Sequence, residues 1–148
     1  VMEGGKKTWY IADGYLPYQN EVKNGNFEGH EAVRILNCSK SPAHVYMDVY
    51  YEDKPPVKDV LITVEAERIK CLRMDHPDEI GGVVLNRQEQ YSLRFRSDVN
   101  VVIQYGRMDL AQPNLPIWNI KCCAWAQRAM YNSSPPWCPP VPLIRTCV

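Results

Sequence analysis

Hydrophobic and polar residues alternate with a period of two along several short segments of the chain. In residues 43–51 the apolar side of this alternation consists of Val45, Met47 and Val49. Such a pattern is typical of a strand with one face against a core, because successive side chains of a strand point to opposite faces. The alternation resumes over residues 57–65 after an Asp-Lys-Pro-Pro turn at 53–56, which predicts a hairpin.

Five further segments have the composition of strands. These are residues 9–12, 32–36, 69–74, 90–96 and 99–105. The segment 99–105 is almost continuously apolar and is predicted to be a central strand, whereas no 12-residue window before Trp118 has a helical period. About seven short strands at this spacing predict an all-β fold, a single-domain antiparallel β-sandwich.

Composition narrows the class of protein further. The 148 residues include 45% apolar and 23% charged residues, which suits one domain with a sizeable core. Seventeen basic residues balance seventeen acidic ones, so we expect no nucleic-acid partner. No apolar run approaches the roughly 20 residues of a membrane-spanning helix, and residues 1–7 do not resemble a signal peptide. We therefore expect a soluble, cytoplasmic protein.

The composition changes near residue 110. Residues 110–148 contain three basic and no acidic residues, and they hold four of the six cysteines. Five of the twelve prolines lie within residues 133–142, which excludes a regular helix or a central strand there. We predict a β-sandwich domain over residues 1–118 and an irregular, Pro/Cys-rich tail over 119–148. This tail is either a disordered, non-native frame-shift product or a partner-binding segment.

Two charged pairs are candidates for binding. His30 and Glu31 lie next to each other at the start of the predicted strand 32–36, where they can serve as acid and base, metal ligands or hydrogen-bond partners of a polar ligand. Adjacent residues of a strand point to opposite faces, however, and a structural hydrogen bond is the alternative for His30. Arg107 and Asp109 can hold a carboxylate, a phosphate or sugar hydroxyls, or can form only a surface ion pair.

Aromatic residues and cysteines complete the candidate chemistry. Trp9, Tyr15 and Tyr18 flank a predicted tight turn at Asp13-Gly14, and they can stack on a sugar, close a pocket or belong to the core. Phosphate-binding loops, nucleophile elbows and zinc spacings are absent from the sequence, so we predict no catalytic residue, no metal and no cofactor. The thiols of Cys38 and Cys71 are expected to be buried and free, while the four tail cysteines are treated as incidental.

Five blocks of sequence follow one another in a fixed order over residues 7 to about 115. They are W-x2-A-D-G-Y-L-P at 9–17, H-E-A-V-R-I-L-N at 30–37, A-H-V with V-Y-Y-E-D-K-P at 43–55, L-x-T-V with A-E-R and R-M-D at 61–75, and S-D-V-N-V-V-I-Q with Y-G-R-M-D at 97–109. In order and spacing the chain resembles the Anabaena sensory rhodopsin transducer family. The resemblance implies a small cytosolic β-sandwich that assembles as a cyclic homotetramer.

The resemblance also implies a function and a set of site residues. The suggested ligand is a sugar or sugar derivative, so the expected function is a non-enzymatic small-molecule-binding module in metabolite sensing or signalling. The matching positions imply ligand binding by Trp9, His30, Glu31, Arg68, Arg107 and Asp109. In such a site an aromatic ring covers the sugar face while polar groups bind hydroxyls.

Two alternatives to this binding module stay open. One is a protein-interaction adaptor for a membrane receptor such as a sensory rhodopsin, which predicts an apolar or aromatic patch near Tyr46 and Tyr50. The other is an enzyme acting on the same sugar, which requires His30 and Glu31 on a common substrate, since a fold alone does not establish an activity.

Overall fold

The computed structural model describes residues 4–19, residues 28–110 and the backbone of residues 117–120. Its elements are β1 (Lys6–Tyr15), β2 (His30–Asn37), β3 (Ala43–Tyr51), β4 (Val57–Val64), β5 (Arg68–Arg73), the short 3-10 helix η1 (Pro77–Ile80), β6 (Gln90–Met108) and β7 (Ile117–Ile120). All strand pairings are antiparallel. The predicted all-β fold is therefore confirmed. In the described part of the chain, no helix is long and apolar enough to cross a membrane.

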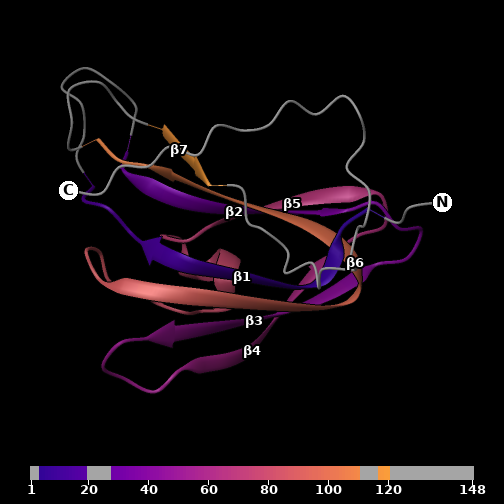
Figure 1. Cartoon of the computed structure of the whole chain (residues 1–148), viewed down its shortest axis with the longest axis horizontal. Coiled ribbons are helices and arrows are strands. Elements are labelled where there is room, and N and C mark those ends of the chain that lie inside the picture. Colours follow the sequence, from indigo (N-terminus) through magenta and orange to yellow (C-terminus); the bar gives the residue numbers. More distant parts are fainter. Residues whose placement is uncertain (1–3, 20–27, 111–116, 121–148) are drawn as a thin grey trace, which may run out of the picture.

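The strand β6 belongs to both layers of the sandwich. Its first half pairs with β1 and β3, and β4 extends that layer beyond β3. Its second half pairs with β2 and β7, and β5 extends the other layer beyond β2. Figure 1 shows β6 running along the lower layer, bending, and returning through the upper one. We call the two layers the β3 layer and the β2 layer.

The prediction of two separate strands over 90–96 and 99–105 was wrong, because both belong to the 19 residues of β6. Ser97 and Asp98 between them are neither glycine nor proline, and they are intermediate and exposed where the strand passes from one layer to the other. A continuous extended backbone is therefore possible. The prediction that 99–105 is central is confirmed, since β6 pairs with β2 on one side and with β7 on the other.

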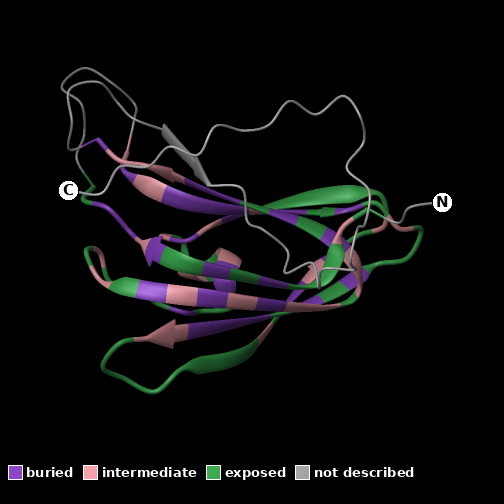
Figure 2. Cartoon of the chain, viewed as in Figure 1, coloured by how far each residue is buried: buried purple, intermediate pink, exposed green. Residues whose placement is uncertain are grey.

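The core lies between the two layers and follows the predicted alternation. Val45, Met47 and Val49 of β3 are fully buried. The residues of β6 opposite Met47 and Val49 are Phe95 and Leu93, which are also buried. Figure 2 shows this alternation as buried and exposed residues succeeding one another along the strands. The hairpin predicted around 53–56 is confirmed by the pairing of β3 with β4.

Gly14 lies within β1, where a tight turn was predicted. The strand continues to Tyr15, with a register shift between Ile11 and Gly14 against β6. A Cβ atom at position 14 would lie 2.5 Å from the ring of Tyr91, so only glycine lets the strand pass this ring.

Two further expectations concern the cysteines and the tail. Cys38 and Cys71 are exposed free cysteines, which corrects the prediction that they are buried. The inward position on β5 is taken by Leu72, so Cys71 turns to the outer face. The boundary expected near residue 118 falls within β7, and residues 121–148 lie outside the described residues. The division into domain and tail thus stays a prediction.

Candidate functional site

Glu31 and Arg107 meet in the interior of the sandwich, directly opposite each other on β2 and β6. The Glu31 carboxylate is fully buried. It accepts hydrogen bonds from the hydroxyls of Tyr91 and Tyr105, from the backbone N–H of Tyr15 at 2.7 Å and from Nε of Arg107 at 3.1 Å. These five residues form what we call the Glu31 cluster.

The Glu31 cluster connects both layers of the sandwich. Tyr91 belongs to the half of β6 in the β3 layer, whereas Tyr105 belongs to the half in the β2 layer. Burial, together with the neighbouring Glu31 carboxylate, holds the pKa of both phenols above the ordinary value, so both keep their protons at neutral pH and donate hydrogen bonds to Glu31. Burial lowers the pKa of Arg107, but the stronger effect of Tyr105 and Glu31 raises it. The cluster therefore links the two layers of the sandwich through hydrogen bonds to Glu31.

Trp9 and Arg68 lie far from the Glu31 cluster. Trp9 is buried in the core, and its indole N–H donates to the carbonyls of Lys6 and Val101 at 3.0 Å. Its ring therefore packs inside the sandwich. Arg68 is exposed and pairs with the last residue of β2, whereas His30 is the first, so the two are about 20 Å apart along the strand.

His30 points to the outer face of the β2 layer, away from Glu31, as expected for neighbours on a strand. Its Nδ1 lies 2.8 Å from the carbonyl of Glu28, which is the structural hydrogen bond considered from the sequence. Asp109 follows the end of β6, and Arg107 forms ion pairs with Glu31 and Asp13. The structure thus joins Glu31 with Arg107 but spreads the other predicted residues.

A hollow of about 340 Å³ opens on the outer face between β2 and β6. It is lined by His30, Ala32, Arg34, Gln104, Gly106, Arg107 and Met108. The strand register explains it, because the small residues Ala32 and Gly106 lie opposite each other and leave a gap in the row of side chains. We call this feature the β2–β6 hollow. Arg34 and Gln104 were missed from the sequence, since only the register brings them together.

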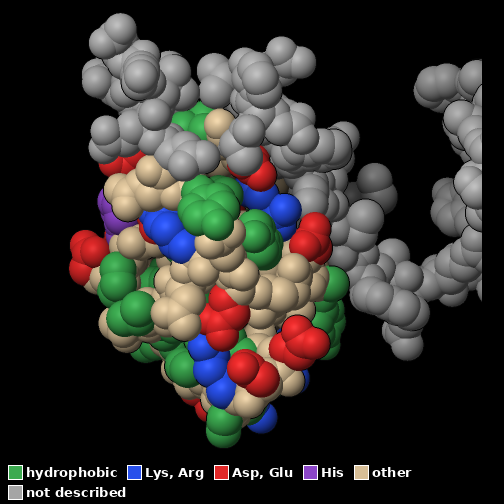
Figure 3. Space-filling view, turned by 90° about the vertical axis from the view of Figure 1, so that its left-hand side faces the viewer, with side chains coloured by type: hydrophobic (Ala, Val, Ile, Leu, Met, Phe, Trp, Pro, Cys, Tyr) green, Lys and Arg blue, Asp and Glu red, His purple; other side chains and the backbone are tan. Residues whose placement is uncertain are grey.

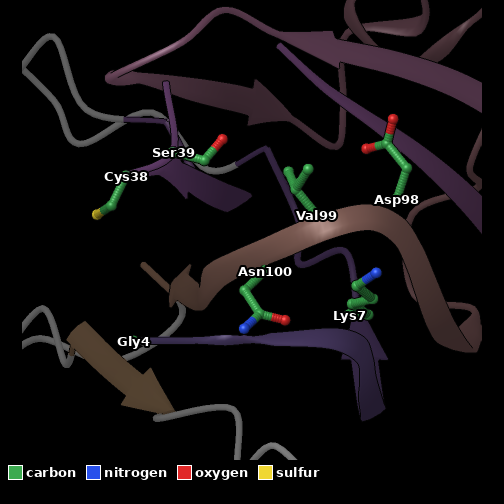
Figure 4. Close-up of a pocket in the computed structure, with 7 residues that line it drawn as sticks. All are labelled: Gly4, Lys7, Cys38, Ser39, Asp98, Val99 and Asn100. Carbon is green, nitrogen blue, oxygen red and sulfur yellow. The ribbon is translucent and has the colours of Figure 1, made fainter. Parts of the chain in front are cut away.

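A second hollow, of about 400 Å³, lies beside the turn between β2 and β3 (Figure 4). It is lined by Gly4, Lys7, Cys38, Ser39, Asp98, Val99 and Asn100, none of which was predicted as a site residue. Asp98 accepts from the backbone N–H of His44 at 2.9 Å and contacts its imidazole at 2.7 Å. In Figure 4 the thiol of Cys38 points away from the other lining side chains. The carboxylate of Asp98 is thus already bound to His44 of β3.

The outer face of the β3 layer carries a group of tyrosines and arginines. Arg94 and Arg96 both reach the fully buried carboxylate of Asp48, at 2.6 and 3.0 Å. Arg94 lies over the ring of Tyr50 and Arg96 over that of Tyr46, each 5.8 Å from the ring centre. We call Tyr10, Tyr46, Tyr50, Arg94 and Arg96 the tyrosine–arginine face. It contains the aromatic patch that the adaptor alternative predicted near Tyr46 and Tyr50.

Asp48 holds this face together. Its burial alone would raise the pKa of the carboxyl group, but hydrogen bonds from the backbone of Asp59 and from Arg94 and Arg96 outweigh burial, so the pKa is lowered. Asp48 is therefore ionised at neutral pH. Arg96 also contacts Asp59 at 2.5 Å, so the two arginines face two carboxylates.

Charges of both signs are mixed on the surface. Figure 3 shows the end of the molecule at which β1 and β3 finish, where basic and acidic side chains are interspersed with apolar ones. In this view the described residues form no large patch of one charge sign. Recognition at this end would thus depend on local contacts rather than on bulk charge.

Comparisons with known proteins agree with the resemblance drawn from the sequence. A family model described as "ASRT: Anabaena sensory rhodopsin transducer" matches residues 4–125. The solved structure "Anabaena sensory rhodopsin transducer" is similar at 33% identity and a TM-score of 0.61, covering 72% of this chain and 90% of that one. "Crystal Structure of Thermotoga maritima 1070" is similar at 25% identity and a TM-score of 0.68, covering 82% and 96%. Comparison with curated proteins gives no match.

Proposed function

The chain belongs to the Anabaena sensory rhodopsin transducer family, and from this premise we propose that it is a non-enzymatic, cytoplasmic adaptor that binds a membrane receptor such as a sensory rhodopsin. The observation that carries the proposal is the tyrosine–arginine face. Tyr10 is 50% exposed and Tyr46 is 39% exposed, on a regular antiparallel layer. Tyrosine and arginine are the residue types on which protein interfaces concentrate their binding energy.

The arginines of this face are held in place before a partner arrives. The carboxylate of Asp48 binds the guanidiniums of both arginines, and these guanidiniums lie over the rings of Tyr46 and Tyr50. A surface that is already ordered loses less side-chain entropy on binding. Because Asp48 and Asp59 balance the two arginine charges, we expect contact area and hydrogen bonds to dominate over long-range attraction.

The proposal predicts that Tyr46→Ala weakens receptor binding. Loss of a central exposed ring is expected to lower the affinity for Anabaena sensory rhodopsin in lipid nanodiscs by about tenfold or more, measured by surface plasmon resonance. Tyr18→Ala is the matched control, since Tyr18 is an exposed tyrosine that follows the end of β1 and lies outside the tyrosine–arginine face. Equal affinity of Tyr46→Ala and wild type would contradict the assignment of this face, and no binding by wild type would contradict this receptor as the partner.

We further propose self-association as a cyclic homotetramer through one end of the outer face of the β2 layer, the end farther from His30. Ile69, Leu36 and Val102 lie side by side across β5, β2 and β6, and all three are exposed. A row of exposed apolar residues across three strands is typical of a surface that another protein covers.

This second proposal predicts that a charge in the middle of the apolar row dissociates the assembly. Leu36→Lys is expected to shift the mass in sedimentation equilibrium from four chains to one, because burying an unpaired ammonium group is costly. Leu61→Lys places the same charge on the outer face of the other layer and should leave the mass unchanged. A tetramer that persists in Leu36→Lys, or dissociates in both variants, would contradict this interface.

Small-molecule binding is the second candidate function, and the β2–β6 hollow is the observation that favours it. Of the six residues that the resemblance implied, His30 and Arg107 border this hollow, although the guanidinium of Arg107 turns inward to Glu31. Trp9 lies in the core, so we leave stacking by its ring out of the proposal. The ligand that we propose is sugar-like and is bound through polar groups between β2 and β6.

A further inference from the structure

We propose that the β2–β6 hollow binds the anionic group of a polyhydroxylated small molecule, a carboxylate or a phosphate, through the guanidinium of Arg34. This inference rests on the second proposed function, small-molecule binding, and adds the ligand class and the residue that selects it. Arg34 lies in the middle of β2 and projects from the outer face of the β2 layer.

The hollow has walls of polar side chains and a floor without them. Ala32 and Gly106 form the floor, and on one side of this pair Arg34 lies opposite Gln104. On the other side His30 lies opposite Met108. A small molecule placed over the floor is thus within reach of a cation, an amide and an imidazole, three groups that bind oxygen atoms.

Arg34 differs from the other described arginines in the partners of its guanidinium. Within the part of the chain that the structure describes, its guanidinium has no hydrogen bond and no ion pair. By contrast, Arg73 is held by Asp75 at 2.8 Å. The residues opposite Arg34 on the two neighbouring strands are Cys71 and Gln104, neither of which carries a negative charge.

A half-buried guanidinium with no carboxylate partner favours an anionic ligand. It presents five N–H donors in a planar fork, which fits the two oxygens of a carboxylate or of a phosphate. The neighbouring acceptors cannot compensate its charge, since the groups directly across from it are an amide and a thiol. Among the described residues, the hollow therefore offers a positive charge without a carboxylate partner.

His30 and Gln104 suit the hydroxyl groups of the same ligand. The carbonyl of Glu28 accepts from Nδ1 of His30 at 2.8 Å, so in the neutral imidazole Nε2 is left as an acceptor. The amide of Gln104 can both donate and accept. Together with Arg34 these groups match a sugar acid or a sugar phosphate, in which hydroxyls accompany one anionic group.

Isothermal titration calorimetry of the full chain at pH 7.5 and constant ionic strength tests the inference. The probes are glucose, glucuronate, glucose 6-phosphate and inorganic phosphate. We expect glucuronate or glucose 6-phosphate to bind at least about tenfold more tightly than glucose, because a hydrogen bond to a charged group is stronger than one to a neutral group. Arg34→Gln should remove this difference. The affinities for glucuronate and glucose 6-phosphate show whether the hollow prefers a carboxylate or a phosphate.

Arg68→Gln is the matched control. It makes the same change of charge at the far end of β2, outside the hollow, and should leave all four affinities unchanged. An unchanged melting temperature of Arg34→Gln, with glucose still bound, identifies a folded variant that has lost only the anion preference.

Several outcomes would overturn the inference, and they separate it from the proposed function. If glucose binds as tightly as both anionic sugars, or if Arg34→Gln keeps the preference, the anion site is wrong while small-molecule binding stands. If inorganic phosphate binds as tightly as glucose 6-phosphate, the hydroxyl contacts are wrong. If none of the four probes binds, both the inference and the sugar-like ligand of the second proposed function fail.

Discussion

Replacing Glu31 with alanine is expected to lower the free energy of unfolding by about 4 kcal/mol, the range found when one partner of a buried charged pair is removed. The substitution leaves four donors of the Glu31 cluster without their acceptor: two phenols, a backbone N–H and the Nε of Arg107. It also opens a cavity between the layers, since the Glu31 side chain is fully buried.

Urea denaturation followed by tryptophan fluorescence measures this loss, as a lower midpoint at an unchanged slope. All variants are compared at one protein concentration, because the proposed self-association makes stability depend on concentration. Glu31→Gln keeps one acceptor oxygen and is expected to cost less than Glu31→Ala. Glu52→Ala removes an exposed carboxylate and should change the stability by less than about 0.5 kcal/mol. A loss below about 1 kcal/mol for Glu31→Ala would contradict the structural role of the cluster.

A second substitution separates the hydrogen-bond network from the cavity. In the wild type, Tyr105→Phe removes a hydrogen bond to Glu31 and is expected to destabilise the protein by about 1 kcal/mol. In the Glu31→Ala background the hydroxyl of Tyr105 has lost its acceptor but still accepts from Nε of Arg107 at 3.2 Å, so the same change should cost clearly less than in the wild type. Equal effects in both backgrounds would show that the two residues do not interact.

Much of the fold follows from the alternation of residue types. The hairpin around residues 53–56 and the buried faces of β3 and β6 were predicted, because a strand with one face on a core repeats every two residues. The continuity of β6 was not predicted, since the polar residues Ser97 and Asp98 interrupt the apolar pattern between the two halves of the strand. Gly14 was taken for a turn residue, although it is needed to pass the ring of Tyr91.

The candidate site could be predicted less well than the fold. The opposite directions of His30 and Glu31 follow from strand geometry and were expected. The β2–β6 hollow depends instead on which residue of β6 lies opposite Ala32, and a shift of register by one would replace Gly106 by a residue of the other face. The local sequence pattern does not indicate which residues pair between strands about 70 residues apart, so Arg34 and Gln104 were missed.

Asp48→Asn is expected to lower the free energy of unfolding by about 2 kcal/mol at neutral pH, less than for a fully buried pair because both arginines keep contact with water. It removes the charge that both guanidiniums share while keeping the size of the side chain. Asp59→Asn is the matched control, since Asp59 is exposed, contacts Arg96 and has a positive φ that asparagine also tolerates. A cost below about 0.5 kcal/mol is expected for it.

The pH dependence of stability distinguishes this role from simple packing. The pKa of Asp48 is lower in the folded protein than the ordinary value of about 3.9, so folding favours the ionised form. Its stabilising contribution is therefore complete above that value and is lost as the pH falls through the lowered pKa of the folded carboxyl group, because the unfolded chain takes up this proton more readily than the folded protein. Urea midpoints of wild type and Asp48→Asn should differ at pH 7 and converge toward pH 3. A constant difference over this range would mean that Asp48 stabilises the tyrosine–arginine face by shape alone.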